Sequence, residues 1–170
     1  MNDKTVVTLT GHKHSGKDYV AERLAMNSAV KYIKPYTDKG NRHLRENEIP
    51  EEYGGYHFVT KEELDLMIQT EKVISITTIE DKKQGTINRY VFFESQLTAP
   101  YNVLIVDDYA LVDFRSNWKG KLFTIRVKSK NQIESDRVGE YFYEHEFDEV
   151  FNYGIDDFDE LEAKISDIFR

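Results

Sequence analysis

The sequence of 170 residues contains no cysteine, which excludes disulfide bonds and thiolate chemistry. This composition fits a reducing compartment, and we expect a cytoplasmic protein. No apolar run approaches the roughly 18 residues of a membrane-spanning helix, and no signal-peptide pattern is evident, so no membrane partner is expected. Acidic residues exceed basic ones and the net charge is −8, which disfavours nonspecific binding to a polyanion. We therefore expect no nucleic acid partner.

Internal repeats and low-complexity tracts are also missing. His43, His57 and His145 lack the spacing of metal ligands, so we interpret them as structural or surface residues. Hydrophobic residues make up 39% of the chain and aromatic residues 13%, which is typical of a folded protein. The length fits one domain with a sizeable core. It does not distinguish a monomer from a homodimer.

A glycine-rich loop near the start of the chain is the strongest motif. It follows an apolar, β-branched stretch at 5–10 and precedes a helical pattern at 19–27, the context that a G-x-x-x-x-G-K phosphate loop requires. Glycines allow close backbone approach to an anion, and successive N–H groups then face phosphate oxygens. Lys17 would reach the β- and γ-phosphates, while Asp18 replaces the usual Ser or Thr as a ligand for Mg²⁺. A chance glycine loop is the alternative. The loop residues are Gly11, His12, Lys13, His14, Ser15, Gly16, Lys17 and Asp18.

Strand and helix patterns alternate along the rest of the chain, which predicts an α/β fold with a mainly parallel central sheet. Strands are expected at 30–33, 73–79, 87–93, 102–106, 121–127 and 149–152, and helices from Thr60 and Asp157. The two strands between 73 and 93 form an antiparallel hairpin joined by a turn at 81–85. We expect one domain over 1–170, with a core from 1–30 and 100–170, an inserted arm at 31–99 and a short lid or helix at 128–143.

Asp107 follows an apolar strand, the Walker-B pattern in which a carboxylate supports Mg²⁺ or its waters. Many strands end at an aspartate, so a structural role stays open. Ligands of open α/β sheets bind at the carboxyl ends of the strands, where Gly11 and Asp107 both fall. Asp18 and Asp107 are therefore the candidate metal ligands.

A second group of polar residues follows in the long polar stretch at 28–59. Arg42 and Arg45 are three residues apart and Tyr56 comes later. Arginine provides bidentate donors to phosphate and tyrosine adds a hydroxyl donor, so these residues could clamp the phosphate of a second substrate. A solvated charged loop is the alternative.

These motifs resemble the guanylate kinase family. Residues 42–48, Arg-His-Leu-Arg-Glu-Asn-Glu, are similar to the family's R-x-P-R-x-G-E, and Tyr56-His57-Phe58 matches its Y-x-F. Residues 150–153 are similar to its closing V-x-N-D. The resemblance implies a three-layer P-loop NTPase fold with a nucleoside monophosphate-binding arm. It also implies ATP-dependent phosphorylation of a nucleoside or deoxynucleoside monophosphate, with GMP or dGMP as the leading acceptor and ATP and Mg²⁺ as cofactors.

The resemblance also assigns residue roles. It implies that Lys17, Arg42 and Arg137 are catalytic and that Asn152 lies beside the donor adenine. On the acceptor side it implies that the phosphate is held by Arg42, Arg45 and Tyr56. It also implies that Ser75 and Thr86 face the base, and that Asp107 or Asp108 lies near the acceptor ribose or Mg²⁺.

Four departures from the family keep other functions open, and one of them is that two extra residues separate Glu48 from Tyr56. Asp18 replaces Ser or Thr, and Ser75 stands where the family has a glutamate that reads guanine, so base and sugar preference are undetermined. The lid is short and retains only Lys128, Lys130 and Arg137. Lid arginines neutralise charge in phosphoryl transfer. A catalytically weak binding module and a kinase of another small acceptor are therefore the alternative functions.

Overall fold

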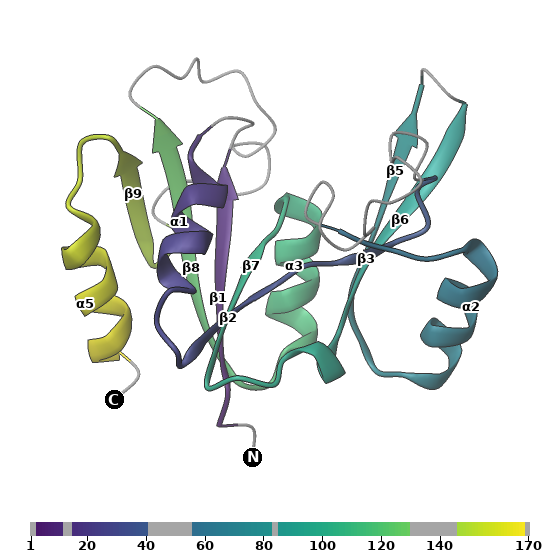
Figure 1. The fold of residues 1–170 in the computed structure, drawn as a ribbon, viewed down its shortest axis with the longest axis horizontal. Coiled ribbons are helices and arrows are strands. Elements are labelled where there is room, and N and C mark those ends of the chain that lie inside the picture. The colour runs from purple at the N-terminus through teal and green to yellow at the C-terminus, as the bar shows by residue number, and fades with distance from the viewer. Residues whose placement is uncertain (1–2, 12–14, 41–55, 83–84, 130–145, 169–170) are drawn as a thin grey trace. The chain divides into compact units, whose positions relative to one another are not determined.

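The computed structural model describes residues 3–11, 15–40, 56–82, 85–129 and 146–168. The chain divides into two compact units, each of which is described by itself. Residues 1–32 and 98–170 make up the core unit, and residues 33–97 make up the arm unit (Figure 1).

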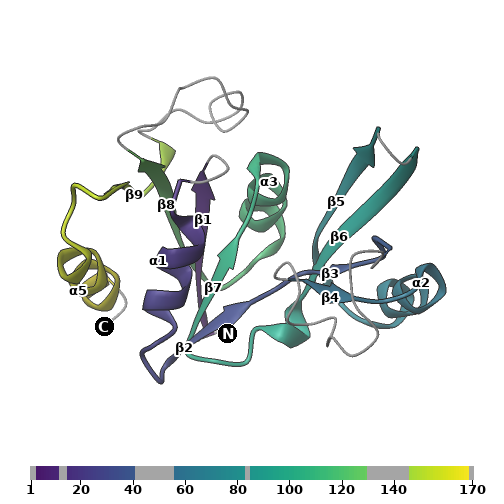
Figure 2. The same cartoon turned by 45° about the horizontal axis from the view of Figure 1, so that its top comes forward.

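The core unit contains a five-stranded sheet. Its strands are β1 (Thr5–Gly11), β2 (Val30–Ile33), β7 (Tyr101–Ile105), β8 (Lys121–Ser129) and β9 (Glu149–Tyr153). Their order is β2-β7-β1-β8-β9 (Figure 2). β1 pairs in parallel with both β7 and β8, and β8 pairs in parallel with β9. β1 is central, and nearly all of its residues are buried, which is typical of a parallel strand whose two faces are both covered.

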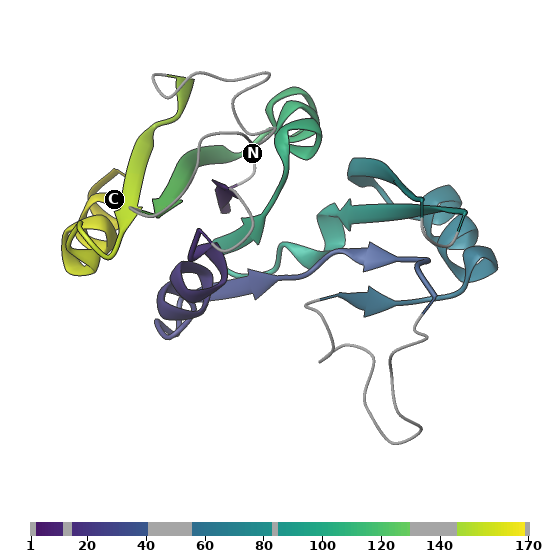
Figure 3. The same cartoon turned by 90° about the horizontal axis from the view of Figure 1, so that it is seen from above.

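Helices cover both faces of this sheet. α1 (Lys17–Leu24) and α5 (Phe158–Ile168) pack on one face, and α3 (Asp108–Asn117) covers the other (Figure 3). Alternate residues of each strand point to one face, and those of β1, β7 and β8 form one apolar core with the inner sides of α1 and α5. That core comprises Val7, Leu9, Val20, Ala21, Leu24, Val103, Phe123, Ile125, Val127, Phe151, Leu161 and Ile165.

The arm unit contains a four-stranded sheet in the order β4-β3-β6-β5. The strands are β3 (Tyr36–Thr37), β4 (His57–Phe58), β5 (Val73–Asp81) and β6 (Thr86–Phe93). β5 and β6 form an antiparallel hairpin with a register shift between Val73 and Ser75. The helix α2 (Lys61–Thr70) packs on one face through Leu64, and a short 3₁₀ helix, η2 (Glu94–Gln96), follows β6.

The α/β fold and most strands agree with the sequence-based expectation, with several differences at helices and boundaries. The sequence analysis predicted no helix at α3, because it interpreted the aspartates after the strand as candidate ligands. In the structure, Asp107 is the N-cap of this helix. β3 and β4 lie in the polar stretch at 28–59 and were not predicted, because a strand of two residues is too short to show a hydrophobic period. The helix expected at 19–27 is α1, which begins at Lys17 and ends at Leu24. It therefore starts two residues earlier and ends three residues earlier than expected.

The prediction of a lid or helix at 128–143 was wrong for its first two residues. Lys128 and Ser129 belong to β8 and pair with Asn152 and Tyr153 of β9. Residues 130–143 lie outside the described residues. Likewise Asp81 is the last residue of β5 and not part of the turn. In the described portion of the chain, no helix has both the length and the hydrophobicity needed to span a membrane.

Candidate functional site

Two glycines of the loop occupy positions that admit no side chain. Gly16 has a φ of 96°, in the left-handed region, and a Cβ there would lie 2.7 Å from Cγ of Tyr153. A Cβ on Gly11 would lie 2.5 Å from the carbonyl oxygen of Val127. Both distances are too short for real atoms, so the loop backbone has this course only with glycine at these positions.

The loop ends at the start of α1, where polar groups are available to an anion. Gly16 is the N-cap of α1 and provides no side-chain cap, so the first N–H groups of the helix form an anion-binding end. Ser15 is fully buried, and its Oγ has no hydrogen-bond partner among the described residues. A buried hydroxyl of this kind needs a partner, and a bound anion or water at the loop would provide it.

The ammonium group of Lys17 lies at the same loop. Its Nζ donates a hydrogen bond of 2.8 Å to the carbonyl oxygen of Gly11. The side chain therefore folds back over the loop from the first residue of α1. This geometry holds a positive charge beside the backbone N–H groups that could receive an anion.

The two predicted metal ligands each use one carboxylate oxygen in a hydrogen bond. Oδ1 of Asp18 accepts from the hydroxyl of Tyr32 at 3.3 Å. Oδ1 of Asp107 accepts from the backbone N–H of Ala110 at 2.8 Å and caps α3. A second oxygen on each carboxylate is left for another ligand. No group of three metal-ligating side chains occurs in the part of the chain that the structure describes, so any cation here would depend on the phosphates and waters it carries.

Arg126 is a charged residue near the loop that the sequence analysis missed. It is buried in β8, and its register partner is Thr10 of β1, one residue before Gly11. Thr8 and Thr10 are fully buried on β1, and their Oγ1 atoms have no hydrogen-bond partner among the described residues. The sheet is therefore polar beneath the loop on the α3 side. A lone arginine within the apolar run 122–127 was the available sequence signal.

In the arm unit, the structure separates two residues that were expected to read one base. Ser75 pairs with Phe92, whereas Thr86 pairs with Asp81 at the far end of the same hairpin. Six positions along β6 correspond to about 20 Å, so one base cannot contact both. Thr77 and Asn88 lie between them on the same face, and the sequence analysis missed both residues.

Tyr56 is part of an aromatic group on this face of the arm unit. Its ring centroid lies 5.3 Å from that of Tyr90 and 6.1 Å from that of Phe58. Burial, with Tyr56 nearby, raises the pKa of Tyr90 to about 12, although a hydrogen bond with Thr37 acts in the opposite direction.

Asn152 is engaged in a turn of the core unit. Its backbone N–H and its Nδ2 both donate to Oδ2 of Asp156, at 2.7 and 3.0 Å. Tyr153, the next residue, instead lies against the loop at Gly16. The remaining predicted site residues lie outside the described residues: His12, Lys13, His14, Arg42, Arg45 and Arg137.

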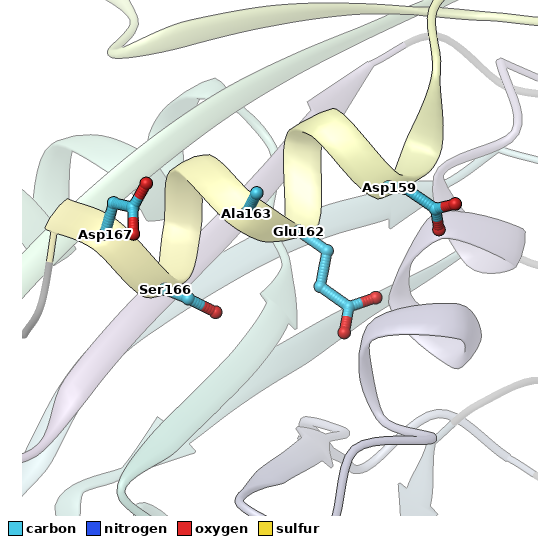
Figure 4. A pocket seen from close by; sticks show the side chains of 5 residues that line it. All are labelled: Asp159, Glu162, Ala163, Ser166 and Asp167. Carbon is cyan, nitrogen blue, oxygen red and sulfur yellow. The ribbon is translucent and has the colours of Figure 1, made fainter.

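A surface hollow of about 330 Å³ lies on α5. Figure 4 shows its lining, which includes Asp159, Glu162 and Asp167. Its acidic lining offers no cation for a phosphate ligand, so the glycine loop is the better candidate site.

Comparison with known proteins supports the fold. No family model and no curated protein sequence matches this chain. The structure of guanylate kinase from Anaplasma phagocytophilum is similar over 98% of this chain and 85% of that one, with a TM-score of 0.63 and 17% sequence identity. The class is thus an α/β fold with a mainly parallel central sheet. Within that class, this chain has a guanylate kinase-like fold.

Proposed function

We propose that this protein is a nucleoside monophosphate kinase that transfers a phosphoryl group from ATP to a ribo- or deoxyribonucleoside monophosphate, with GMP and dGMP as the first acceptors to test. The observation that carries the proposal is the geometry of the loop. Gly11 and Gly16 exclude side chains, and Lys17 Nζ lies 2.8 Å from the Gly11 carbonyl. This arrangement occurs in a guanylate kinase-like fold.

The donor site is assigned to the loop of the core unit. The backbone N–H groups at Gly16 and Lys17 hold the phosphates, and the Lys17 ammonium moves from the Gly11 carbonyl to a phosphate oxygen. Asp18 and Asp107 support Mg²⁺ with their second carboxylate oxygens. When bound, ATP supplies the phosphoryl group and Mg²⁺ neutralises phosphate charge. His12, Lys13, His14 and Ser15 complete the loop, and Asn152 belongs to the turn on the adenine side.

The acceptor site is assigned to the arm unit. Tyr56 donates its hydroxyl to the acceptor phosphate, together with Arg42 and Arg45. Because Ser75 and Thr86 lie far apart, only one of them contacts the base. The resemblance to guanylate kinases assigns Asp107 to the acceptor ribose or to Mg²⁺. In this proposal the acceptor site lies within the arm at 31–99, and the donor site lies within the core at 1–30 and 100–170.

Catalysis in this proposal depends on positioning and electrostatics, because phosphoryl transfer requires no covalent protein intermediate. Lys17 and Arg42 bind phosphate groups on the two sides of the transfer. Arg137, in the lid segment 130–143, adds positive charge in the transition state.

The decisive experiment follows ADP formation with ATP, Mg²⁺ and each common ribo- and deoxyribonucleoside monophosphate. We expect turnover with a narrow set of acceptors. Lys17→Met keeps the length of the side chain but removes its charge, so we expect a loss of about 10²- to 10³-fold in turnover. Lys31→Met is the matched control, because Lys31 is exposed and its Nζ donates to Thr98 at 3.2 Å, away from the loop. It should leave turnover unchanged.

The outcome separates the proposal from its alternatives. Turnover that is lost in Lys17→Met and kept in Lys31→Met supports the kinase. Binding of ATP without turnover on any acceptor refutes it and favours a binding module or a kinase of another small acceptor.

A further inference from the structure

Arg126 is a charged side chain that is buried at the loop end of the core sheet. Its exposed fraction is 7%, and its neighbours in β8, Ile125 and Val127, belong to the apolar core with α1 and α5. Side chains alternate along a strand, so Arg126 lies on the opposite face, which α3 covers (Figure 3). Burying a charge is costly, and an apolar side chain at such a position often gives equal or greater stability. Stability alone therefore gives little reason for an arginine here.

The position of Arg126 in the sheet brings it next to the glycine loop. Its register partner on β1 is Thr10, and the next pair is Gly11 with Val127. A Cβ on Gly11 would lie 2.5 Å from the carbonyl oxygen of Val127, so the backbone of β8 contacts the first residue of the loop. Neighbouring strands are about 4.8 Å apart, and an extended arginine side chain is longer than that. The guanidinium group can therefore reach an anion held over the end of β1.

The same face of the sheet carries hydroxyl groups whose hydrogen-bonding capacity is unused. Thr8 and Thr10 alternate with Val7 and Leu9 of the apolar core, so they share the face of Arg126. Both threonines are fully buried, and their Oγ1 atoms have no hydrogen-bond partner in the part of the chain that the structure describes. Buried hydroxyl groups need a partner. A ligand, or water bound with it, would provide one, because Thr10 directly precedes the loop.

Acidic groups near the loop favour a further cation at a phosphate site. Asp18 lies in the first turn of α1, Asp107 is the N-cap of α3, and Asp108 is buried in the first turn of α3. Their negative charges oppose a phosphate ligand, and the ammonium group of Lys17 offsets only part of them. A guanidinium group binds phosphate through two parallel hydrogen bonds and stays charged when it is buried. Arg126 therefore has the chemistry that this position requires.

We infer that Arg126 is a second phosphate-binding cation of the loop site. It contacts the phosphates from the α3 side of the sheet, whereas Lys17 contacts them from the start of α1. The ligand is the polyphosphate part of the donor nucleotide, for which tripolyphosphate is the probe. This inference rests on the proposed function, because it requires the loop to bind phosphates. It does not require phosphoryl transfer to follow.

The test measures tripolyphosphate binding to the full chain by calorimetry without Mg²⁺, so that Asp18 and Asp107 hold no cation. Arg126→Met should weaken binding by roughly 10- to 150-fold. Arg126→Lys keeps the charge, so it should bind more tightly than Arg126→Met. Arg115→Met is the matched control. Arg115 is exposed in the last turn of α3, at the end opposite Asp107, and donates to the carbonyl oxygen of Glu146 at 2.8 Å, so its loss should leave the affinity unchanged.

A merely structural role predicts a different pattern. If Arg126 serves only to neutralise the buried Asp108 carboxylate, the loss caused by Arg126→Met should disappear in an Asp108→Asn background. Contact with phosphate predicts the same loss in both backgrounds. A second measurement uses the unaltered protein and does not depend on the folding of Arg126→Met. The ¹⁵N-labelled Nε–H resonance of Arg126, assigned by its absence in Arg126→Lys, should shift on addition of tripolyphosphate, whereas that of Arg115 should not.

Three results would overturn the inference and leave the proposed function intact: unchanged tripolyphosphate binding in folded Arg126→Met, a loss that Asp108→Asn removes, or an Arg126 resonance that does not move. If the unaltered protein binds no tripolyphosphate, the inference fails, and the proposed function fails with it unless ATP still supports turnover. A loss of binding in Arg126→Met that persists in the Asp108→Asn background, in a protein that shows no turnover with any acceptor, supports the inference and refutes the kinase alone.

Discussion

Replacing Gly16 with alanine is expected to destabilise the core unit for two separable reasons. The φ of 96° is in the left-handed region, where an alanine costs roughly 1–2 kcal/mol. The new methyl group would also lie 2.7 Å from Cγ of Tyr153. Cγ is at the fixed end of the ring, so the strand or the loop must shift, and overpacking of this kind costs about 1–3 kcal/mol. The total is about 2–5 kcal/mol.

Two further variants separate these contributions. Gly154 has a φ of 86°, and a Cβ there would meet nothing within 4 Å, so Gly154→Ala should cost only the backbone part of about 1–2 kcal/mol. In a Tyr153→Ala background the ring is absent, and Gly16→Ala should then cost about as much as Gly154→Ala. The coupling energy of the Gly16–Tyr153 pair should therefore be about 1–3 kcal/mol.

The single tryptophan of the chain provides the assay. Trp118 is buried in the core unit, and its Nε1–H donates to the carbonyl oxygen of Lys121 at 3.0 Å. Its fluorescence in a urea titration therefore follows unfolding of the unit that contains Gly16, Tyr153 and Gly154. The reasoning is refuted if Gly16→Ala costs no more than Gly154→Ala, or if removing the Tyr153 ring leaves the cost of Gly16→Ala unchanged.

Two more predictions concern the arm unit. Arg89 Nε donates to Oδ2 of Asp38 at 2.8 Å, and the Asp38 side chain is fully buried. Arg89→Met leaves this buried carboxylate without its ion pair, so it should lower the free energy of unfolding by about 3–5 kcal/mol. Hydrogen exchange of the β5 and β6 amides measures this cost, and unchanged protection would contradict it. Burial raises the pKa of Tyr90 to about 12 from its ordinary 10.0, so the folded state holds the proton more tightly. Stability should fall as pH rises from 10 to 12, and a Tyr90→Phe variant that falls as steeply in this range would contradict the assignment.

The functional proposal combines a local motif with a fold that the motif alone does not guarantee. The motif requires a strand before it and a helix after it, and the structure provides both as β1 and α1. The turn at Asn152 and the buried Arg126 of β8 come from parts of the chain that the loop motif does not include. The structural likeness to guanylate kinase supports the fold in which these parts meet.

The sequence by itself determined the features that arise from neighbouring residues. Thr60 was expected to cap a helix, and its Oγ1 accepts from the Glu63 N–H at 3.1 Å. The hairpin from Val73 to Phe93 was readable because two alternating stretches flank a turn. The glycine-rich loop was recognisable because its glycines have a fixed spacing, and the structure shows that Gly11 and Gly16 leave no room for a side chain.

Only the tertiary structure decided which distant residues meet. Arg126 lies beside Thr10 through the pairing of β1 with β8. Tyr153 lies against Gly16 because β9 joins the same sheet and its turn is closed by Asp156. Local propensity specifies each of these segments, whereas packing and strand pairing, which act between segments far apart in the chain, specify the contacts among them.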